Sequence, residues 1–161
     1  MAALRVLMNK LKLPVIETTT QLRRIPDESI DFLGYSIGRC YSPRTGRAYI
    51  GTRPSRKAVQ RVCREVSDLT RRRWLLLDAQ DRVARINRLL LGWSNYFRLG
   101  PVSKAYGSVD RHTRRRLRQW LRAKHKVQGE GTARFPDEYL YQELGLIQLR
   151  ERTRSFPWAT A

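Results

Sequence analysis

The sequence has few of the residues from which catalytic, metal and membrane sites are built. Its two cysteines, Cys40 and Cys63, and its two histidines, His112 and His125, form no pattern of zinc ligands. No two aspartates are adjacent, no phosphate-binding loop of the form GxxxxGK followed by Ser or Thr occurs, and no run of about 18 apolar residues is present. We therefore expect no catalytic residue, no metal site, no cofactor and no membrane partner.

The cysteine content also argues against a disulfide-rich secreted protein. Two cysteines without a disulfide framework favour a reducing compartment, and Met1 to Lys10 lack the long apolar core of a secretion signal. We expect a cytoplasmic location, and a disulfide between the two cysteines stays an alternative.

Acidic residues are scarce as well. The 161 residues include 33 Lys and Arg but only 14 Asp and Glu, which gives a formal net charge of +19. Such an excess predicts a polyanionic partner, with nucleic acid ahead of an anionic membrane. The segment from Arg82 to Lys126 holds thirteen of the basic residues and a single acid, Asp110. Since 41% of the residues are hydrophobic, we expect a folded core and not a disordered basic tail.

The first third of the chain is predicted to contain a short helix and several strands. Apolar residues at helical spacing predict a helix over 2–12, and β-branched residues predict a strand over 15–20. A β-hairpin is expected over 30–52, its first strand running to Gly38, because a Ser-Pro-Arg-Thr-Gly turn separates two β-rich segments. Gly34 inside that strand indicates a close backbone approach or a bulge.

Three helices are predicted in the middle of the chain. The first covers 54–76 with Ser55 as its cap, the second covers 79–98, and the third covers about 104–125 with Ser103 as its cap. The residues expected to face a shared core lie on one stripe of each helix: Ala58, Val59, Val62, Cys63, Val66, Leu69, Val83, Ile86, Leu89, Leu90, Trp93, Tyr96, Phe97, Tyr106, Val109, Thr113, Leu117, Trp120 and Leu121.

Three residues of the second helix need an explanation. Gly92 costs about 1 kcal/mol relative to Ala in a helix, which suggests that another backbone packs closely there. Asn87 and Asn95 lie within an apolar segment, and a buried amide needs hydrogen-bond partners. We favour bonds to a neighbouring loop or helix end over contacts to RNA sugar or phosphate.

The chain after the third helix is predicted to fold back. A Gly-containing linker covers 127–133, and a short helix covers 135–145, opened by a proline and acids and closed by Gly145. The remaining residues contain Phe156 and Trp158, and we expect these aromatic side chains to pack on the helices.

The third helix carries a cationic face. A solvated face usually mixes charges of both signs, but no acid occurs from Arg111 to Lys126, so like charges repel there without a partner. A bound polyanion relieves that repulsion, and we favour a nucleic-acid face over a solvated one. The residues expected to bind RNA are the cations on and beside this face and one on the preceding helix: Arg111, Arg114, Arg115, Arg118, Arg122, Lys124, Lys126 and Arg88.

Two segments carry a longer motif. Residues 87–97 read N-x-x-L-x-G-W-x-N-Y-F, and residues 116–125 read R-L-x-x-W-L-R-x-K-H. This pattern resembles the maturase-specific domain, also called thumb or X, of group II intron reverse transcriptases. Residues 32–35 resemble the FLGY strand of the family's primer-grip hairpin, and 134–146 with 155–159 resemble its C-terminal end. The resemblance implies structural roles for Phe32, Leu33, Gly34, Tyr35, Asn87, Gly92, Trp93, Asn95, Tyr96 and Trp120.

The resemblance implies a mainly α fold. A palm remnant with a β-hairpin is expected over 1–52, a thumb-like three-helix bundle over 53–126, and a C-terminal helix and tail on the bundle over 127–161. Such enzymes polymerise DNA with palm aspartates in a Tyr/Phe-x-Asp-Asp turn, which this sequence lacks, so the fingers and most of the palm would precede Met1. Where the family often carries N-x-x-K-T, residues 16–20 read Ile-Glu-Thr-Thr-Thr.

Several functions are consistent with these observations. The resemblance favours an RNA-binding maturase-type fragment that assists the folding or splicing of a group II intron and has no polymerase activity of its own. Its partner would be structured RNA, above all group II intron RNA, or an RNA–DNA duplex. One alternative is a C-terminal piece of a split reverse transcriptase that needs a separate fingers–palm polypeptide, and another is a remnant without function. A DNA-binding regulator is supported by charge alone.

Overall fold

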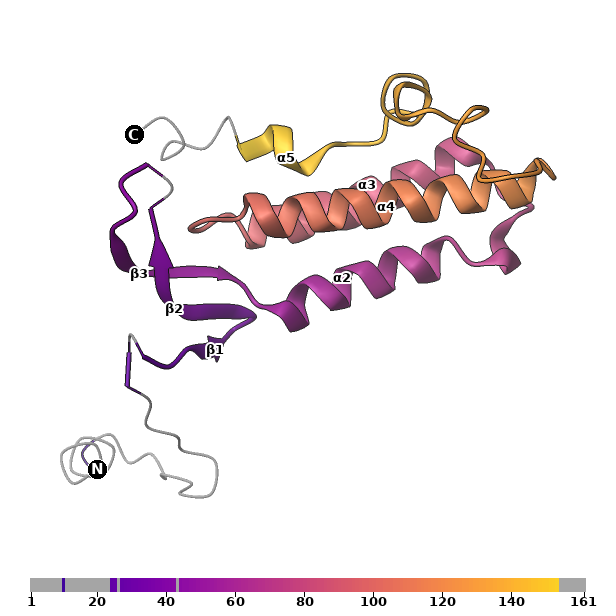
Figure 1. Cartoon of the computed structure of the whole chain (residues 1–161). Coiled ribbons are helices and arrows are strands. Elements are labelled where there is room, and N and C mark those ends of the chain that lie inside the picture. The colour runs from indigo at the N-terminus through magenta and orange to yellow at the C-terminus, as the bar shows by residue number, and fades with distance from the viewer. Residues whose placement is uncertain (1–9, 11–23, 26, 43, 154–161) are drawn as a thin grey trace.

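The computed structural model describes residues 10, 24–25, 27–42 and 44–153. The predicted helix over 2–12, apart from Lys10, and the predicted strand over 15–20 lie outside these residues, as do Phe156 and Trp158. In the described part, a three-stranded sheet is followed by three long helices and by a C-terminal segment with short helical turns (Figure 1).

The sheet differs from the predicted hairpin by one extra reversal of the chain. Its antiparallel strands, in the spatial order β1-β2-β3, are β1 (Ile30–Phe32), β2 (Tyr35–Tyr41) and β3 (Ala48–Pro54). The expected single strand up to Gly38 is wrong, because the chain turns at Leu33 and Gly34 and pairs Phe32 with Tyr35. Both turn residues have positive φ angles, 49° and 82°, as a two-residue hairpin turn of this kind requires.

The second turn and the close approach at Gly34 agree with the sequence. Gly46 N–H donates to the Ser42 carbonyl at 2.9 Å, and this turn joins β2 to β3 as predicted. A Cβ placed on Gly34 would lie 2.9 Å from Phe97 Cζ. The close approach is therefore real, but an aromatic ring makes it and not a backbone segment.

The first long helix, α2 (Arg56–Leu69), is shorter than predicted. Ser55 caps its start, since Ser55 Oγ accepts from the Ala58 N–H at 3.2 Å. The helix ends seven residues before the expected end at residue 76, and one 3₁₀ turn, η1 (Arg72–Trp74), follows it. The helix ends at Thr70 because the hydroxyl group of this residue competes for a helix carbonyl: Thr70 Oγ1 donates to the Val66 carbonyl at 2.9 Å.

The other two long helices match their predictions closely. They are α3 (Ala79–Tyr96), which Asp78 caps, and α4 (Ser103–Lys124). Ser103 was expected to cap α4, but it is the first helical residue. Val102 stands at the cap position, where its apolar side chain has no atom that could accept a hydrogen bond from the helix and is instead buried in the core.

The close contact predicted at Gly92 occurs elsewhere. Gly92 is exposed, and no atom beyond its chain neighbours and its own helix backbone lies within 4 Å of where its Cβ would be. A Cβ at Gly100, in the loop after α3, would instead collide with the carbonyl of Thr52 on β3, and Gly100 has a positive φ of 74°. The backbone that approaches closely is therefore that of the sheet, at the loop and not in the helix.

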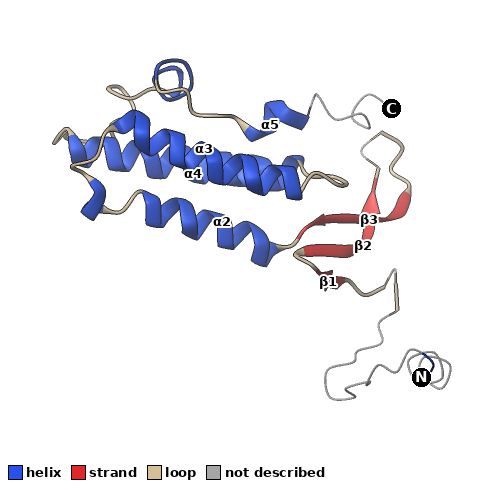
Figure 2. Cartoon of the chain, turned by 180° about the vertical axis from the view of Figure 1, so that it is seen from behind, coloured by secondary structure: helices blue, strands red, loops and turns tan. Residues whose placement is uncertain are grey.

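The helices form a bundle with the sheet at one end (Figures 1 and 2). Helix α2 contacts both α3 and α4. Most residues of the predicted core stripes of α2, α3 and α4 are buried together. The exceptions are six partly buried side chains and Tyr96, which is 52% exposed; the six are Ala58, Val59, Cys63, Leu69, Leu89 and Trp93. The fold class is thus confirmed: a helix-rich chain with a three-stranded antiparallel sheet before a three-helix bundle.

The C-terminal segment closes over the bundle. The helix predicted over 135–145 is shorter in the structure, where the π-helical turn η2 covers Tyr139–Glu143. Gly145 follows this turn with a positive φ of 69°, so the predicted role of this glycine in closing the helix agrees with the structure. The sequence did not predict α5 (Leu149–Arg152), which contacts α4. This segment contributes four side chains to the same core as the long helices, namely Phe135, Leu140, Leu146 and Leu149.

Candidate nucleic-acid interface

Four of the eight predicted RNA-binding residues meet at one groove beside α4. The groove has a volume of about 590 Å³ and carries two carboxylates as well as four guanidinium groups. Its lining residues are Arg111, Arg114, Arg115, Arg118, Thr132, Pro136, Asp137 and Glu138.

Arg111 and Arg115 are the exposed members of this set. They stand one helical turn apart on α4. Among the residues that the structure describes, neither has a hydrogen-bond or ion-pair partner. Their guanidinium groups are therefore available to a ligand from solution.

Arg114 and Arg118 have a shared acidic partner. Arg114 Nη1 forms an ion pair with Asp137 Oδ2, and Arg118 Nη2 contacts Asp137 Oδ1 at 2.5 Å. Arg118 Nε also donates to the Phe135 carbonyl at 2.8 Å. The expectation that the whole face lacks an acidic partner is wrong for these two residues, because the carboxylate comes from a later segment of the chain.

The two guanidinium groups stabilise the ionised form of Asp137. Partial burial would raise the pKa of this carboxyl, but the hydrogen bond from Arg118 and the charge of Arg114 outweigh burial and hold the pKa below its usual value. Asp137 is thus charged at neutral pH and fixes the segment before η2 against α4.

The remaining predicted residues do not line the groove. Arg122 Nη1 donates to the Gly129 carbonyl at 2.6 Å, and Lys124 Nζ donates to the carbonyls of Leu75 and Leu77 at 2.9 and 2.8 Å. Two others are exposed side chains without a partner among the described residues, namely Lys126, after α4, and Arg88, on α3.

Part of the positive charge in this region holds the fold together. Arg116 binds the C-terminal end of α2 through Thr70 Oγ1 at 3.1 Å and the carbonyls of Ser67 and Thr70 at 3.3 and 3.2 Å. Arg82 is buried, its guanidinium 5.1 Å from the centre of the Trp74 ring, and burial lowers its pKa. Charge counting along the sequence cannot separate such residues from free ones, because the distinction depends on contacts between distant segments.

The two asparagines of α3 bind other parts of the protein. Asn87 Nδ2 donates to the Gly145 carbonyl at 2.8 Å, and the Ile147 N–H donates to Asn87 Oδ1 at 3.0 Å. Asn95 Oδ1 accepts from Arg152 Nη2 at 3.1 Å. The structural interpretation of Asn87 is therefore confirmed: its amide joins α3 to the C-terminal segment.

The first part of the family motif joins the sheet to α3. Tyr35 Oη donates to the Tyr96 carbonyl at 2.6 Å, and Tyr96 Oη donates back to the Leu33 carbonyl at 2.9 Å. The rings of Tyr35 and Phe97 are 5.1 Å apart. Tyr96 was expected in the core, but half of it is exposed because it reaches across to the β1–β2 turn, where Phe32 and Leu33 are also exposed.

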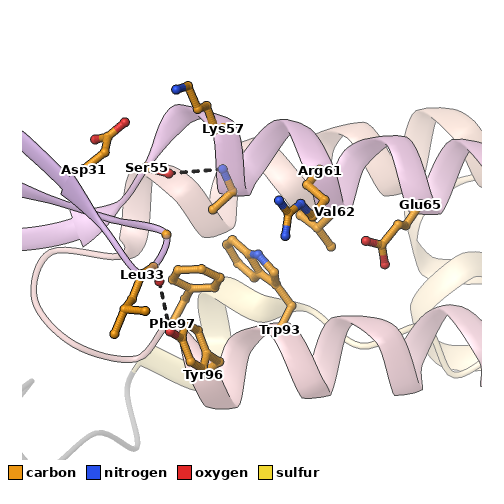
Figure 3. A pocket seen from close by; sticks show the side chains of 12 residues that line it. Asp31, Leu33, Ser55, Lys57, Arg61, Val62, Glu65, Trp93, Tyr96 and Phe97 are labelled. Carbon is orange, nitrogen blue, oxygen red and sulfur yellow. Dashed lines mark hydrogen bonds between the residues drawn. The ribbon is translucent and has the colours of Figure 1, made fainter. Parts of the chain in front are cut away.

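A second hollow lies next to this junction. It has a volume of about 530 Å³ and lies between α2, α3 and the β1–β2 turn (Figure 3). Trp93 and Phe97 reach into it from α3, and two acids and two bases line it, namely Asp31, Glu65, Lys57 and Arg61. The two signs are balanced here, in contrast to the groove beside α4.

The described residues show neither a metal centre nor a membrane helix. No three His, Cys, Asp or Glu side chains in that part of the chain gather closely enough to hold a metal ion. None of its helices combines the length and the apolar character that crossing a membrane requires.

Comparison with known proteins identifies one family. The family model described as "Group II intron, maturase-specific domain" matches residues 59–140, which is just over half of the chain and includes most of α2 and all of α3 and α4. No curated protein matches the chain.

Proposed function

Because the chain belongs to the family of group II intron maturase-specific domains, we propose that it binds structured RNA, above all group II intron RNA, and assists the folding or splicing of that intron. The groove beside α4 carries this proposal. It lies within the matched region, and two of its arginines, Arg111 and Arg115, have no partner in the described part of the chain.

The chemistry of the groove suits RNA. A double-stranded RNA is recognised mostly through its phosphates, its 2′-hydroxyl groups and its shape, because side chains cannot read its narrow major groove. The planar guanidinium group of arginine presents several donors to a phosphate at once. A formal charge of +19 adds a general attraction to any polyanion.

The aromatic residues of the motif have another role in this proposal. Phe97 and Trp120 are buried, and Trp93 is partly buried. These rings pack the bundle and do not stack on bases. The sequence has no two adjacent aspartates and so lacks the family's polymerase motif, and in this proposal the protein does not polymerise DNA by itself.

A binding titration tests the proposal. The full chain is titrated against a group II intron RNA and against a scrambled duplex of equal length at two salt concentrations. We expect tighter binding to the intron RNA and weaker binding of both RNAs at the higher salt concentration. Equal affinity for both RNAs would contradict a preference for group II intron RNA. No binding to either RNA would overturn the whole proposal.

A second candidate is the C-terminal piece of a split reverse transcriptase. The exposed apolar side chains of the sheet favour it, because Phe32, Leu33 and Ile50 are each about 60% exposed or more. A fingers–palm polypeptide of this family with the catalytic aspartates would cover them. Primer extension by the mixture, but by neither chain alone, is the result that distinguishes this candidate from the first.

A further inference from the structure

We infer that Asp137 divides the four arginines of the groove into two pairs with different roles. Arg111 and Arg115 contact RNA phosphates, whereas Arg114 and Arg118 are withheld from RNA by Asp137. The inference rests on the proposed function, since it names the residues that contact the RNA and the residue that limits their number.

The withheld pair is bound on several sides. Arg114 and Arg118 hold one oxygen each of the Asp137 carboxylate, and their side chains are only 33% and 17% exposed. Arg118 also donates its Nε–H to the Phe135 carbonyl. A phosphate that took these donors would leave the Asp137 carboxylate without its partners in a place that is partly closed to water, which disfavours the exchange.

The free pair differs in each of these respects. Arg111 and Arg115 are exposed, have no partner in the described part of the chain and stand at i and i+4 on α4, where side chains are neighbours. Their like charges repel each other, and an RNA strand relieves that repulsion. The groove thus presents two guanidinium groups to the ligand and not four.

The carboxylate of Asp137 takes the position that a phosphate oxygen would take. Carboxylates and phosphates accept from arginine in the same paired geometry. Asp137 therefore acts as an internal competitor of the RNA backbone. Glu138 lies beside it in the same groove but has no ion-pair partner among the described residues, so it changes the charge of the groove without holding an arginine.

Two double variants with the same change of charge test the division. Arg111→Gln with Arg115→Gln should flatten the negative slope of log affinity against log salt by about 1.8, the value for two phosphate contacts on a B-form duplex. Arg114→Gln with Arg118→Gln should leave the slope unchanged and lower the melting temperature. If the Arg114/Arg118 variant flattens the slope as much as the Arg111/Arg115 variant does, the division is wrong.

A second pair of variants tests whether Asp137 competes with the RNA backbone. Asp137→Asn and Glu138→Gln each remove one negative charge from the groove, but only Asp137→Asn releases arginines. We expect Asp137→Asn to tighten RNA binding and steepen the salt slope more than Glu138→Gln does. Equal effects of the two variants, or weaker binding by Asp137→Asn, would overturn the inference.

A measurement without RNA separates this inference from the proposed function. Phenylglyoxal modifies accessible arginine side chains, and peptide mass spectrometry reports the rate at each position. In the wild-type protein, Arg111 and Arg115 should react faster than Arg114 and Arg118, and Asp137→Asn should remove most of the difference. Equal rates in the wild type would overturn the division. A protein that shows the difference but binds no RNA would overturn the proposed function and the RNA contacts of Arg111 and Arg115, but not the pairing of Arg114 and Arg118 with Asp137.

Discussion

The groove beside α4 and the hollow between α2, α3 and the sheet have similar volumes, about 590 and 530 Å³, but different linings. The groove has four arginines against two acids, while the hollow has two bases, two acids and the rings of Trp93 and Phe97. Volume alone therefore does not identify a binding site. The unbalanced charge of the groove indicates a polyanion, and the hollow marks the place where the sheet is joined to the bundle.

The largest expected effect concerns the hollow. Phe97→Ala removes a buried ring that packs on Tyr35 and over Gly34, and we expect it to lower the free energy of unfolding by about 3 to 5 kcal/mol. Urea denaturation measures this loss, with the exposed Leu99→Ala as a control that should change little. A small loss for Phe97→Ala would mean that the ring does not join the sheet to α3.

The second prediction compares the cations of the two regions. Lys57→Gln with Arg61→Gln in the hollow removes the same charge as Arg111→Gln with Arg115→Gln in the groove. The groove variant should flatten the negative salt slope of RNA binding by about 1.8, because it loses two phosphate contacts. The hollow variant should leave that slope close to the wild-type value. An equal flattening of the salt slope in both variants would show that RNA contacts both regions, and the groove and the hollow would then not differ in RNA binding.

A third prediction sharpens the description of the junction. Tyr106 Oη, which is buried, shares its one hydrogen between the carbonyls of Ser94 and Phe97 at 3.0 and 2.9 Å, and burial raises the pKa of Tyr106 to about 12. Tyr106→Phe leaves these carbonyls unpaired at the end of α3, so we expect a loss of about 1 to 3 kcal/mol in unfolding free energy. Tyr96→Phe, whose hydroxyl group is exposed, should cost less than about 1 kcal/mol because water replaces the lost bond. Urea denaturation of both variants measures these losses, and a larger loss for Tyr96→Phe than for Tyr106→Phe would contradict the prediction.

The smallest expected effect is a pH dependence in the groove. The pKa of Asp137 in the folded protein lies below its value in the unfolded chain, about 3.9. Its ion pairs therefore stabilise the protein fully above that pH and lose this effect as the pH falls through the folded pKa. Asp137→Asn should be less stable than the wild type at pH 7 by under about 1 kcal/mol, since the pair is partly exposed, and the gap should narrow as the pH falls through the folded pKa of Asp137. A gap of constant size from neutral to strongly acid pH would mean that the effect of the substitution does not come from charge.

Much of the helical bundle was predictable because helical spacing of apolar residues reports one buried face directly. Val83, Ile86 and Leu90 are buried as their spacing predicts. The helix cap at Ser55 was also predictable, since a cap acts on the residues that follow it within one turn. Both signals are local in the sequence.

The errors concern contacts between segments that are far apart in the sequence. The turn at Leu33 and Gly34 was missed because a β-rich segment continues across it, and the aromatic ring that packs over this turn comes from Phe97. Gly92 was given a close contact that belongs to Gly100, whose neighbour is the carbonyl of Thr52. No spacing rule along one segment reports such a neighbour.

The same limit applies to the arginines of α4. Their number, their helical spacing and the lack of nearby acids were readable from the chain, and so was the maturase-type motif around them. Which of them are free was not, because Asp137 reaches Arg114 and Arg118 only after the chain has folded back over α4. Charge and periodicity are properties of the residues themselves. Whether a charge is available to a ligand depends on which partner the fold brings within hydrogen-bond distance.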